Sequence, residues 1–410
     1  MRHKFILLLF FLFPVLSATV VDAGSTIYAL LGFVSFFHCR KSIVLLAPKE
    51  KHLLIGFAVF FLVSCLSLFM TEDFLTGIKR FERYGRLLLL IPIYLMLRKE
   101  SFETGKAFLL GSFMALFVML GQAWYQVEIL DNPFAHGAYH KIILGNMTIL
   151  FTILIFIGVC FYGKNRINYL LAIIPMAAGF YTSLLSGTRT AWFFVPVVIV
   201  TLLILYRKRL SKHDWKLITL SIAVTSLLIL IWPPEKLVYG LGMVWVDLAD
   251  FSQDSFGGSL GTRLVMWRNS LLIFKESPLF GTGVGDFMHD SIILLEKGLS
   301  YKNDFAVNST NAHSIYFMLL AEGGLVGLIL LVFVLFILPY RFVYGLWKKT
   351  SDKSLQFYTL LAMISIIAFA WFGVSESWVN RNPMVNAYCM TLLVFVSSAA
   401  NRAKVINELQ

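Results

Sequence analysis

The sequence predicts an all-α polytopic membrane protein with about twelve transmembrane helices and one long polar loop. Of its 410 residues, 58% are hydrophobic and only 14% are charged, whereas a soluble globular protein is roughly 45–50% apolar and about 25% charged. The apolar residues form blocks of about 17–25 residues, the length of a helix that crosses the hydrocarbon core of a bilayer. One helical bundle therefore explains the composition better than two or three soluble domains.

The expected spans follow the apolar blocks along the chain. They are 5–21, 26–38, 53–70, 86–97, 105–127, 142–162, 168–185, 190–206, 216–232, 313–340, 355–373 and 385–400. The span at 86–97 is short, and an amphipathic lead from Phe74 extends it. The chain is accordingly divided into nine spans over 1–232, a large loop with short helices over 233–312, three spans over 313–400 and a tail over 401–410.

The start of the first span also resembles a signal peptide. A basic segment that includes Arg2 and Lys4 precedes an apolar run that continues to Val21. Because another span follows almost at once, a retained first helix is favoured over a cleaved signal.

The distribution of lysine and arginine between the short loops predicts the orientation of the bundle. With the N-terminus in the cytoplasm, the cytoplasmic segments carry 22 of the 35 basic residues and six of the 23 acidic residues, a charge of +16. The other side then carries 13 basic and 17 acidic residues, a charge of −4. This asymmetry predicts an even number of spans with both termini in the cytoplasm. It attributes the net charge of +12 to topology and anionic lipid, and it excludes a nucleic-acid-binding role.

No pattern in the sequence indicates a resident metal or cofactor. The four cysteines show neither a CxxC pair nor zinc spacing. The acidic pair of Glu72 and Asp73 has no evident third ligand. The Gly-Thr-Gly-Val-Gly segment at 281–285 lacks the strand–loop–helix context of a nucleotide site and is expected to form a tight turn after Pro278.

Three arginines lie on the side of the membrane where positive charge is expected to be scarce. Arg80, Arg83 and Arg86, together with Lys79, form one basic stripe on an expected helix that leads into the span at 86–97. Two interpretations are open for this stripe. It is either an interfacial helix whose arginines reach lipid phosphates, or an anion-attracting surface at the mouth of a site.

Two further arginines share a local pattern. Arg189 lies in Ser-Gly-Thr-Arg-Thr-Ala-Trp and Arg263 in Ser-Leu-Gly-Thr-Arg-Leu-Val-Met-Trp, so that Gly-Thr-Arg is expected to begin a helix in both. Threonine is a good N-cap residue, but arginine in the first turn opposes the helix dipole, which favours an anion there. Helix amides with a guanidinium form a diphosphate receptor. The pair indicates either a bound external anion or coincidence in a loop rich in glycine and serine.

A histidine and a glutamate mark the start of the span at 313–340. His313 follows a run of asparagine and serine that is expected to cap a helix, and it is either a structural residue or a general acid–base. Glu322 lies two and a half turns further along, roughly on the opposite face, so it is expected to pair with an arginine of another helix. Gly324 and Gly327 are expected to let helices approach closely.

These residues resemble the motifs of the O-antigen ligases of Gram-negative lipopolysaccharide assembly, which share a superfamily with O-antigen polymerases and protein O-oligosaccharyltransferases. The most specific match is His313 with Ser314, followed after nine residues by Gly324-Leu-Val-Gly327. The Gly-Thr-Arg elements resemble the family's functional arginines in placement, and Arg86 with Leu90 fits its shorter Arg-x-x-x-Leu motif. The segment Pro-Leu-Phe-Gly-Thr-Gly-Val-Gly-Asp-Phe at 278–287 is similar to the family as well.

The resemblance implies a GT-C-like glycosyltransferase of the bacterial inner membrane, with its active site on the periplasmic side. Such ligases transfer O-antigen polysaccharide from undecaprenyl pyrophosphate to a sugar hydroxyl of lipid A–core, with inversion and without metal, ATP or another cofactor. By the same resemblance, Arg189 and Arg263 hold the diphosphate and His313 accepts the proton of the acceptor hydroxyl. The residues assigned to donor recruitment are Arg80, Arg83 and Arg86, and those assigned to support of the site are Ser314, Glu322, Gly324 and Gly327.

Three other functions fit some of the same observations. An O-antigen polymerase or a protein O-oligosaccharyltransferase of the same superfamily uses a similar donor with another acceptor. A flippase or other transporter of lipid-linked glycans also needs external arginines and many spans. Transporters often show paired repeats and ionisable groups near the membrane midplane, whereas here no half-to-half repeat is evident and the motif residues gather at one surface.

Overall fold

The computed structural model describes residues 2–38, 46–99, 103–162, 166–206 and 258–409, together with the isolated positions 238, 242 and 246. Within these residues the regular structure is helical and contains no strand. The helices are α1 Arg2–Leu16, α2 Ala23–Phe36, α3 Pro48–Ser67, α4 Phe74–Lys99, α5 Thr104–Trp124, α6 Lys141–Tyr162, α7 Arg166–Ser186, α8 Arg189–Tyr206, α11 Gly258–Glu276, α12 Phe287–Glu296, α13 Asp304–Val307, α14 Ile315–Leu330, α15 Leu338–Lys349, α16 Lys353–Ser375 and α17 Asn382–Leu409.

Among the described residues, six helical stretches are long and apolar enough to cross a membrane. They are Pro48–Met70, Thr104–Ile129, Lys141–Phe161, Ile315–Lys349, Lys353–Ser375 and Asn382–Glu408. Shorter apolar helices are His3–Leu16, Ala23–Phe36, Ile173–Ser186 and Arg189–Leu205. Every expected span that falls on described residues overlaps a helix, and the amphipathic lead from Phe74 is confirmed as the first part of α4. The expected span at 216–232, and all of 233–257 except positions 238, 242 and 246, lie outside the described residues.

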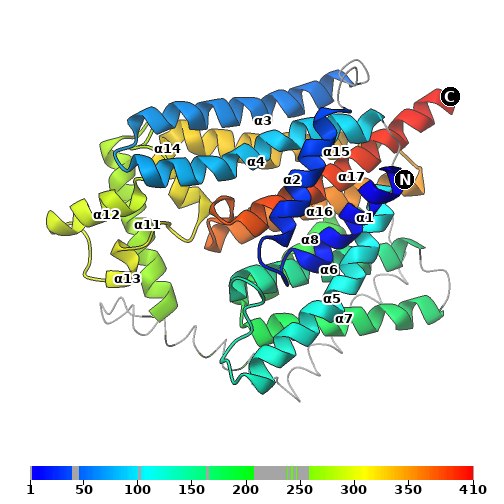
Figure 1. Cartoon of the computed structure of the whole chain (residues 1–410), viewed down its shortest axis with the longest axis horizontal. Coiled ribbons are helices and arrows are strands. Elements are labelled where there is room, and N and C mark those ends of the chain that lie inside the picture. Colours follow the sequence, from blue (N-terminus) through cyan, green and yellow to red (C-terminus); the bar gives the residue numbers. More distant parts are fainter. Residues whose placement is uncertain are drawn as a thin grey trace.

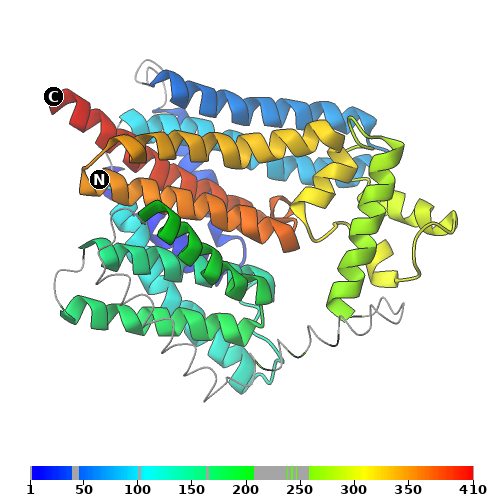
Figure 2. The same cartoon turned by 180° about the vertical axis from the view of Figure 1, so that it is seen from behind.

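The long helices run side by side in one bundle (Figures 1 and 2). The helix α17 packs on α16 and α4 near the centre of the bundle, and the most apolar part of α17 is entirely buried. The helices α11, α12 and α13 gather at one end of the bundle, and the C-terminus lies at the opposite end. The described part of the molecule therefore has a cap, formed by α11, α12 and α13, on one end of the bundle.

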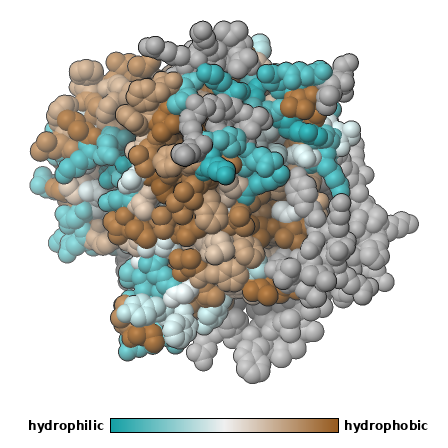
Figure 3. Space-filling view, turned by 45° about the vertical axis from the view of Figure 1, so that its right-hand side comes forward, coloured by the Kyte–Doolittle hydropathy of each residue, from teal (hydrophilic) through white to brown (hydrophobic). Residues whose placement is uncertain are grey.

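The outer surface of the bundle is apolar in the way that lipid contact requires. Large hydrophobic side chains such as Phe33, Leu62, Ile173 and Ile204 are more than half exposed. Figure 3 shows apolar side chains gathered over a broad part of the described surface, with hydrophilic side chains grouped beside them. Since exposed apolar area of this extent is disfavoured in water, the surface indicates a membrane-embedded protein.

The segment between α11 and α12 is fixed against a break in α14. The N–H groups of Leu325 and Val326 donate to the carbonyls of Pro278 and Leu279, at 2.9 and 3.1 Å. At the break, Gly324 has φ +59°, and a Cβ there would lie 2.5 Å from the backbone of Leu279. The expectation that Gly324 serves helix–helix approach is therefore wrong: its missing side chain admits a loop backbone and a left-handed conformation. Gly327 makes only an ordinary contact.

Candidate active site

His313 occupies a strained turn just before α14. Its φ is +47°, a left-handed conformation that costs a residue with a side chain some stability. The Oδ1 atom of Asn311 accepts a hydrogen bond from the N–H of His313 at 3.0 Å, which stabilises the turn. Ser314 takes the N-cap position of α14, but its hydroxyl donates to the carbonyl of Gly373 at 3.3 Å and does not cap the helix. The expected capping run thus holds the turn and joins it to α16.

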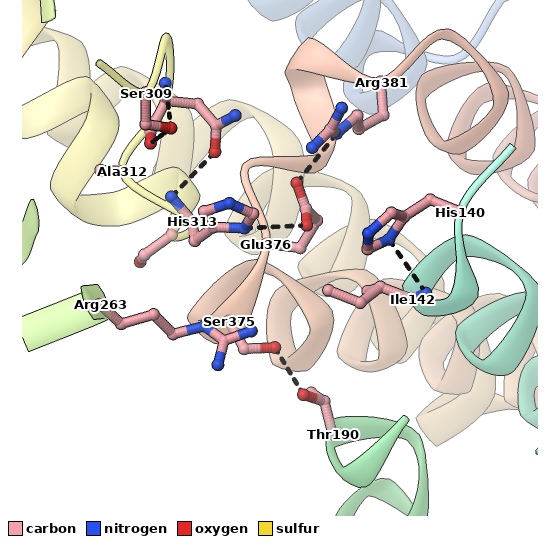
Figure 4. A network of polar contacts seen from close by, with 12 residues as sticks. His140, Ile142, Thr190, Arg263, Ser309, Ala312, His313, Ser375, Glu376 and Arg381 are labelled. Carbon is pink, nitrogen blue, oxygen red and sulfur yellow. Dashed lines mark hydrogen bonds and ion pairs between the residues drawn. The ribbon is translucent and has the colours of Figure 1, made fainter. Parts of the chain in front are cut away.

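A buried glutamate faces this histidine. The Nδ1 atom of His313 lies 3.3 Å from Oε2 of Glu376, and the Nε atom of Arg381 lies 3.1 Å from Oε1. Figure 4 shows the His313 ring and Arg381 approaching Glu376 from different directions. Burial raises the pKa of Glu376, but contacts with His313 and Arg381 outweigh burial and lower the pKa to about 2. Glu376 is therefore a carboxylate at neutral pH, able to fix the orientation of the imidazole.

The first Gly-Thr-Arg element reaches this glutamate through α16. Arg189 is the first residue of α8, as predicted. The hydroxyls of Thr190 and Ser375 are hydrogen-bonded at 2.6 Å, and the Trp371 indole donates to the carbonyl of Thr190 at 2.9 Å. Since Ser375 directly precedes Glu376, the start of α8 lies beside the His313–Glu376 pair.

The second Gly-Thr-Arg element reaches the same place through α11. This helix begins at Gly258, so Arg263 lies in its second turn and the prediction that Gly-Thr-Arg begins the helix is wrong here. The hydroxyl of Thr262 donates to the carbonyl of Gly258 at 2.7 Å, a bond within the helix and not a cap. Four residues after Arg263, the Trp267 indole donates to the carbonyl of Ala312 at 3.1 Å. Arg263 therefore shares a helix face with a side chain that contacts the histidine turn.

Two residues missed by the sequence analysis, Lys141 and His140, complete this side of the site. Lys141 begins α6, and the charged groups that act on it are Arg189 and Arg263. His140 precedes it, and its ring accepts from the N–H of Ile142 at 3.3 Å, as Figure 4 shows. The pKa of His140 is lowered, chiefly by burial, although nearby Glu376 raises it. Lys141 and the two predicted arginines thus form one cationic cluster, which we call the α8 cluster.

The arginine stripe of α4 does not act as one surface. Arg80 is buried and pairs with Glu322 of α14, which is fully buried and also accepts from the N–H of Phe287 at 3.3 Å. This confirms that Glu322 pairs with an arginine of another helix. Arg86 pairs with Glu82 at 2.9 Å and donates to Asn386 of α17 at 3.2 Å. Both arginines therefore join helices, which fits neither interpretation of the stripe.

Arg83 differs from its two neighbours. Its side chain is half-buried, and among the described residues it has neither a hydrogen-bond acceptor nor an acidic partner. Its pKa is lowered, first by burial and then by the charges of Arg80 and Arg381. It is therefore the member of the stripe that is available to a ligand.

The sequence held a weak signal for the residues that were missed. Glu376 and Arg381 lie in the short connection between the last two spans, on the side predicted to be poor in cations. An acidic and a basic residue in so short a connection indicate an ion pair, but not that the partner is His313. His140 and Lys141 directly precede a span and gave no signal beyond their charge.

The fold and the site define a helical membrane protein with a histidine–carboxylate pair and clustered cations at one end of its bundle. Residues 171–332 match the family described as O-antigen ligase, and this stretch includes Arg189, Arg263 and His313. This match covers less than half of the chain, and it supports membership of the O-antigen ligase and polymerase superfamily, whose members are membrane enzymes of the glycosyltransferase type. An uncharacterised protein of Haemophilus influenzae is 26% identical over 403 residues, covering 95% of this chain and 96% of the relative.

Proposed function

We propose that the protein is the O-antigen ligase, which transfers O-antigen polysaccharide from undecaprenyl pyrophosphate to a sugar hydroxyl of lipid A–core. The observation that carries the proposal is the His313–Glu376 pair, because it lies beside both Gly-Thr-Arg arginines and suits base-assisted transfer from a diphosphate. The predicted orientation puts this end of the bundle in the periplasm of a Gram-negative cell and both termini in the cytoplasm. The supporting features are the membership of the superfamily and the His-Ser motif at the start of α14.

The α8 cluster suits the leaving group of such a reaction. Cleavage of the bond between the anomeric carbon and the phosphate oxygen leaves negative charge on a lipid diphosphate. Arg189, Arg263 and Lys141 supply three positive charges, and the N-terminal amides of α8 add the positive end of a helix dipole. Stabilising the charge that develops on the leaving group is the largest contribution that such a site makes to rate.

The His313–Glu376 pair suits the acceptor. With its Nδ1–H facing the Glu376 carboxylate, a neutral His313 presents the Nε2 lone pair as a base. The acceptor oxygen forms a bond to the anomeric carbon while its proton moves to Nε2 and the electron pair of the broken bond leaves with the diphosphate. Attack from the side opposite the leaving group inverts the anomeric configuration.

Complementation of a ligase-deficient strain tests the proposal directly. Wild type, His313→Ala, Arg189→Ala and Arg263→Ala are expressed in a host with matched core and O-antigen. Membrane abundance is measured beside the lipopolysaccharide gel profile. We expect wild type to restore the high-molecular-weight ladder, and each variant to fail at normal abundance.

Three other outcomes separate the alternatives. A wild-type chain that never restores the ladder contradicts the ligase assignment. Rescue of a strain with single-repeat caps would instead identify a polymerase, and glycosylated envelope protein would identify a protein O-oligosaccharyltransferase. Rescue of lipid-linked glycan export without transfer would identify a transporter.

A further inference from the structure

Cations lie on two sides of Glu376. Figure 4 shows Arg381 on one side of this carboxylate and Arg263 on the other. The charges of Arg263 and Arg189 act on Lys141, whereas the charge of Arg381 acts on Arg83 of α4 and on His140. Arg83 and Arg381 therefore form a second group of cations in the site, next to the His313–Glu376 pair.

This second group has an excess of positive charge. Arg80, the neighbour of Arg83 on α4, is neutralised by Glu322, and Arg381 shares Glu376 with His313. Arg83 is half-buried beside two other guanidinium groups and makes no ion pair in the described part of the chain. The charge of Glu82 acts on it, but Glu82 is paired with Arg86. Three arginines against two carboxylates, one of them shared with a histidine, leave a place where an anion is favourable.

Neighbouring polar side chains have unused hydrogen-bonding capacity. Asn380 precedes Arg381 in the short helix Trp378–Asn380, which packs against α4. Only 6% of Asn380 is exposed, and neither amide atom has a partner among the described residues. Tyr84, next to Arg83, is 1% exposed and its hydroxyl is likewise without a partner there. Buried polar groups are rarely left without partners, so these atoms have capacity for further hydrogen bonds beside Arg83 and Arg381.

We infer that Arg83, Arg381 and Asn380 form a subsite for an acidic group of the acceptor glycan, a phosphate or a carboxylate. This inference rests on the proposed function, because it assigns the α8 cluster to the donor diphosphate. The two anionic substrates then lie on opposite sides of the His313–Glu376 pair, and the acceptor hydroxyl meets the anomeric carbon between them. Arg83, predicted to recruit the donor, is thereby reassigned to the acceptor.

Purified full-length protein in vesicles of phosphatidylcholine provides the test. Transfer is measured with lipid A–core as isolated, after enzymatic removal of its phosphates, and after methyl esterification of its carboxyls. Wild type, Arg83→Gln and Arg83→Lys are compared, with Lys79→Gln as the control. Lys79 is an exposed cation of the same helix.

We expect Arg83→Gln to raise the KM for the unmodified acceptor by about 10- to 100-fold, the range for loss of a charge-assisted hydrogen bond. The KM for the donor is expected to stay unchanged, Arg83→Lys to recover part of the loss, and Lys79→Gln to behave as wild type. Removal of the recognised acidic group should raise the acceptor KM of wild type to that of Arg83→Gln. The acceptor KM of Arg83→Gln itself should not change.

The outcomes separate this inference from the proposed function. Absence of transfer by wild type contradicts the proposed function itself. Transfer by wild type with an unchanged acceptor KM in Arg83→Gln overturns the subsite alone. So does an equal loss by wild type and Arg83→Gln when the acceptor is modified. If the Arg83→Gln defect instead arises only when phosphatidylglycerol is added to the vesicles, Arg83 binds a lipid headgroup and the inference is wrong.

Discussion

Two buried glutamates near the same end of the bundle differ in how far their partners are sealed from solvent. Glu322 is fully buried, and its partner Arg80 is 3% exposed. Glu376 is 2% exposed, but its partners His313 and Arg381 are 14% and 35% exposed. Both members of the Arg80–Glu322 pair are buried by protein. In the second group the Glu376 carboxylate is buried, but its partners His313 and Arg381 are partly exposed. We call the first the closed pair and the second the open pair.

This difference in exposure indicates that one pair has a structural role and the other a role in the reaction. The closed pair joins α4 to α14, and Glu322 accepts a hydrogen bond from an N–H at the start of α12, so the pair links the cap of α11, α12 and α13 to the bundle. The open pair presents a histidine and an arginine to whatever enters the site. Sequence position does not distinguish them, because each glutamate lies within or beside an apolar helix. The two glutamates are distinguished instead by whether a ligand can reach their partners.

The largest expected effect comes from the open pair. Replacing His313 by alanine removes the base, and we expect a loss of about 10²–10⁴-fold in transfer rate. Glu376→Gln keeps the shape but removes the charge that orients the imidazole, and a smaller loss of the same kind is expected. Single-turnover rates with purified protein at matched abundance check both. A normal rate in Glu376→Gln would falsify the orienting role.

The closed pair is expected to affect folding more than turnover. Arg80→Ala leaves Glu322 buried without its counter-charge, and we expect a loss of about 3–5 kcal/mol in stability. The double variant Arg80→Ala with Glu322→Ala removes both charges and should lose less than Arg80→Ala alone. Thermal unfolding in detergent measures stability, and activity is expressed per folded molecule. A double variant less stable than Arg80→Ala would contradict this account.

A smaller effect is expected at the break in α14. Gly324→Ala puts a methyl group 2.5 Å from the backbone of Leu279 and forces alanine to adopt φ +59°. We expect a loss of about 1–3 kcal/mol. Gly327→Ala is the matched control, since a Cβ there meets only an ordinary contact at 3.4 Å. Equal melting temperatures for the two variants would show that the break is not constrained.

The smallest expected effect is the change of stability with pH that the Glu376 carboxylate causes near neutral pH. Because its pKa is lowered from 4.5 to about 2, the stabilisation it gives is fully present above pH 4.5 and is lost as the pH falls through about 2. The stability difference between wild type and Glu376→Gln should therefore be constant from neutral pH down to about 4.5 and should shrink as the pH falls from 4.5 to about 2. A difference that changes between pH 6 and 8, within roughly two units of the ordinary histidine pKa, would require another titrating group.

Apolar blocks predicted the helices well because the length of a span is imposed by the bilayer itself. The same reasoning predicted the partner class of Glu322, since a buried charge in an apolar helix must find a counter-charge. It did not find Glu376, because the contact with His313 joins residues 63 positions apart through packing of α14 on α16. It also treated three arginines of α4 alike, although their neighbours on other helices give each a different role.

The left-handed backbone at His313 puts stability and activity in opposition at a single residue. Glycine adopts φ +47° without steric cost, and asparagine adopts it more readily than most residues. His313→Gly is therefore expected to fold better than His313→Ala, because both variants lose the imidazole and its contact with Glu376 and only glycine relieves the backbone. The turn geometry alone would favour glycine at this position. The histidine found there makes the turn a place where the demands of turnover outweigh those of backbone geometry.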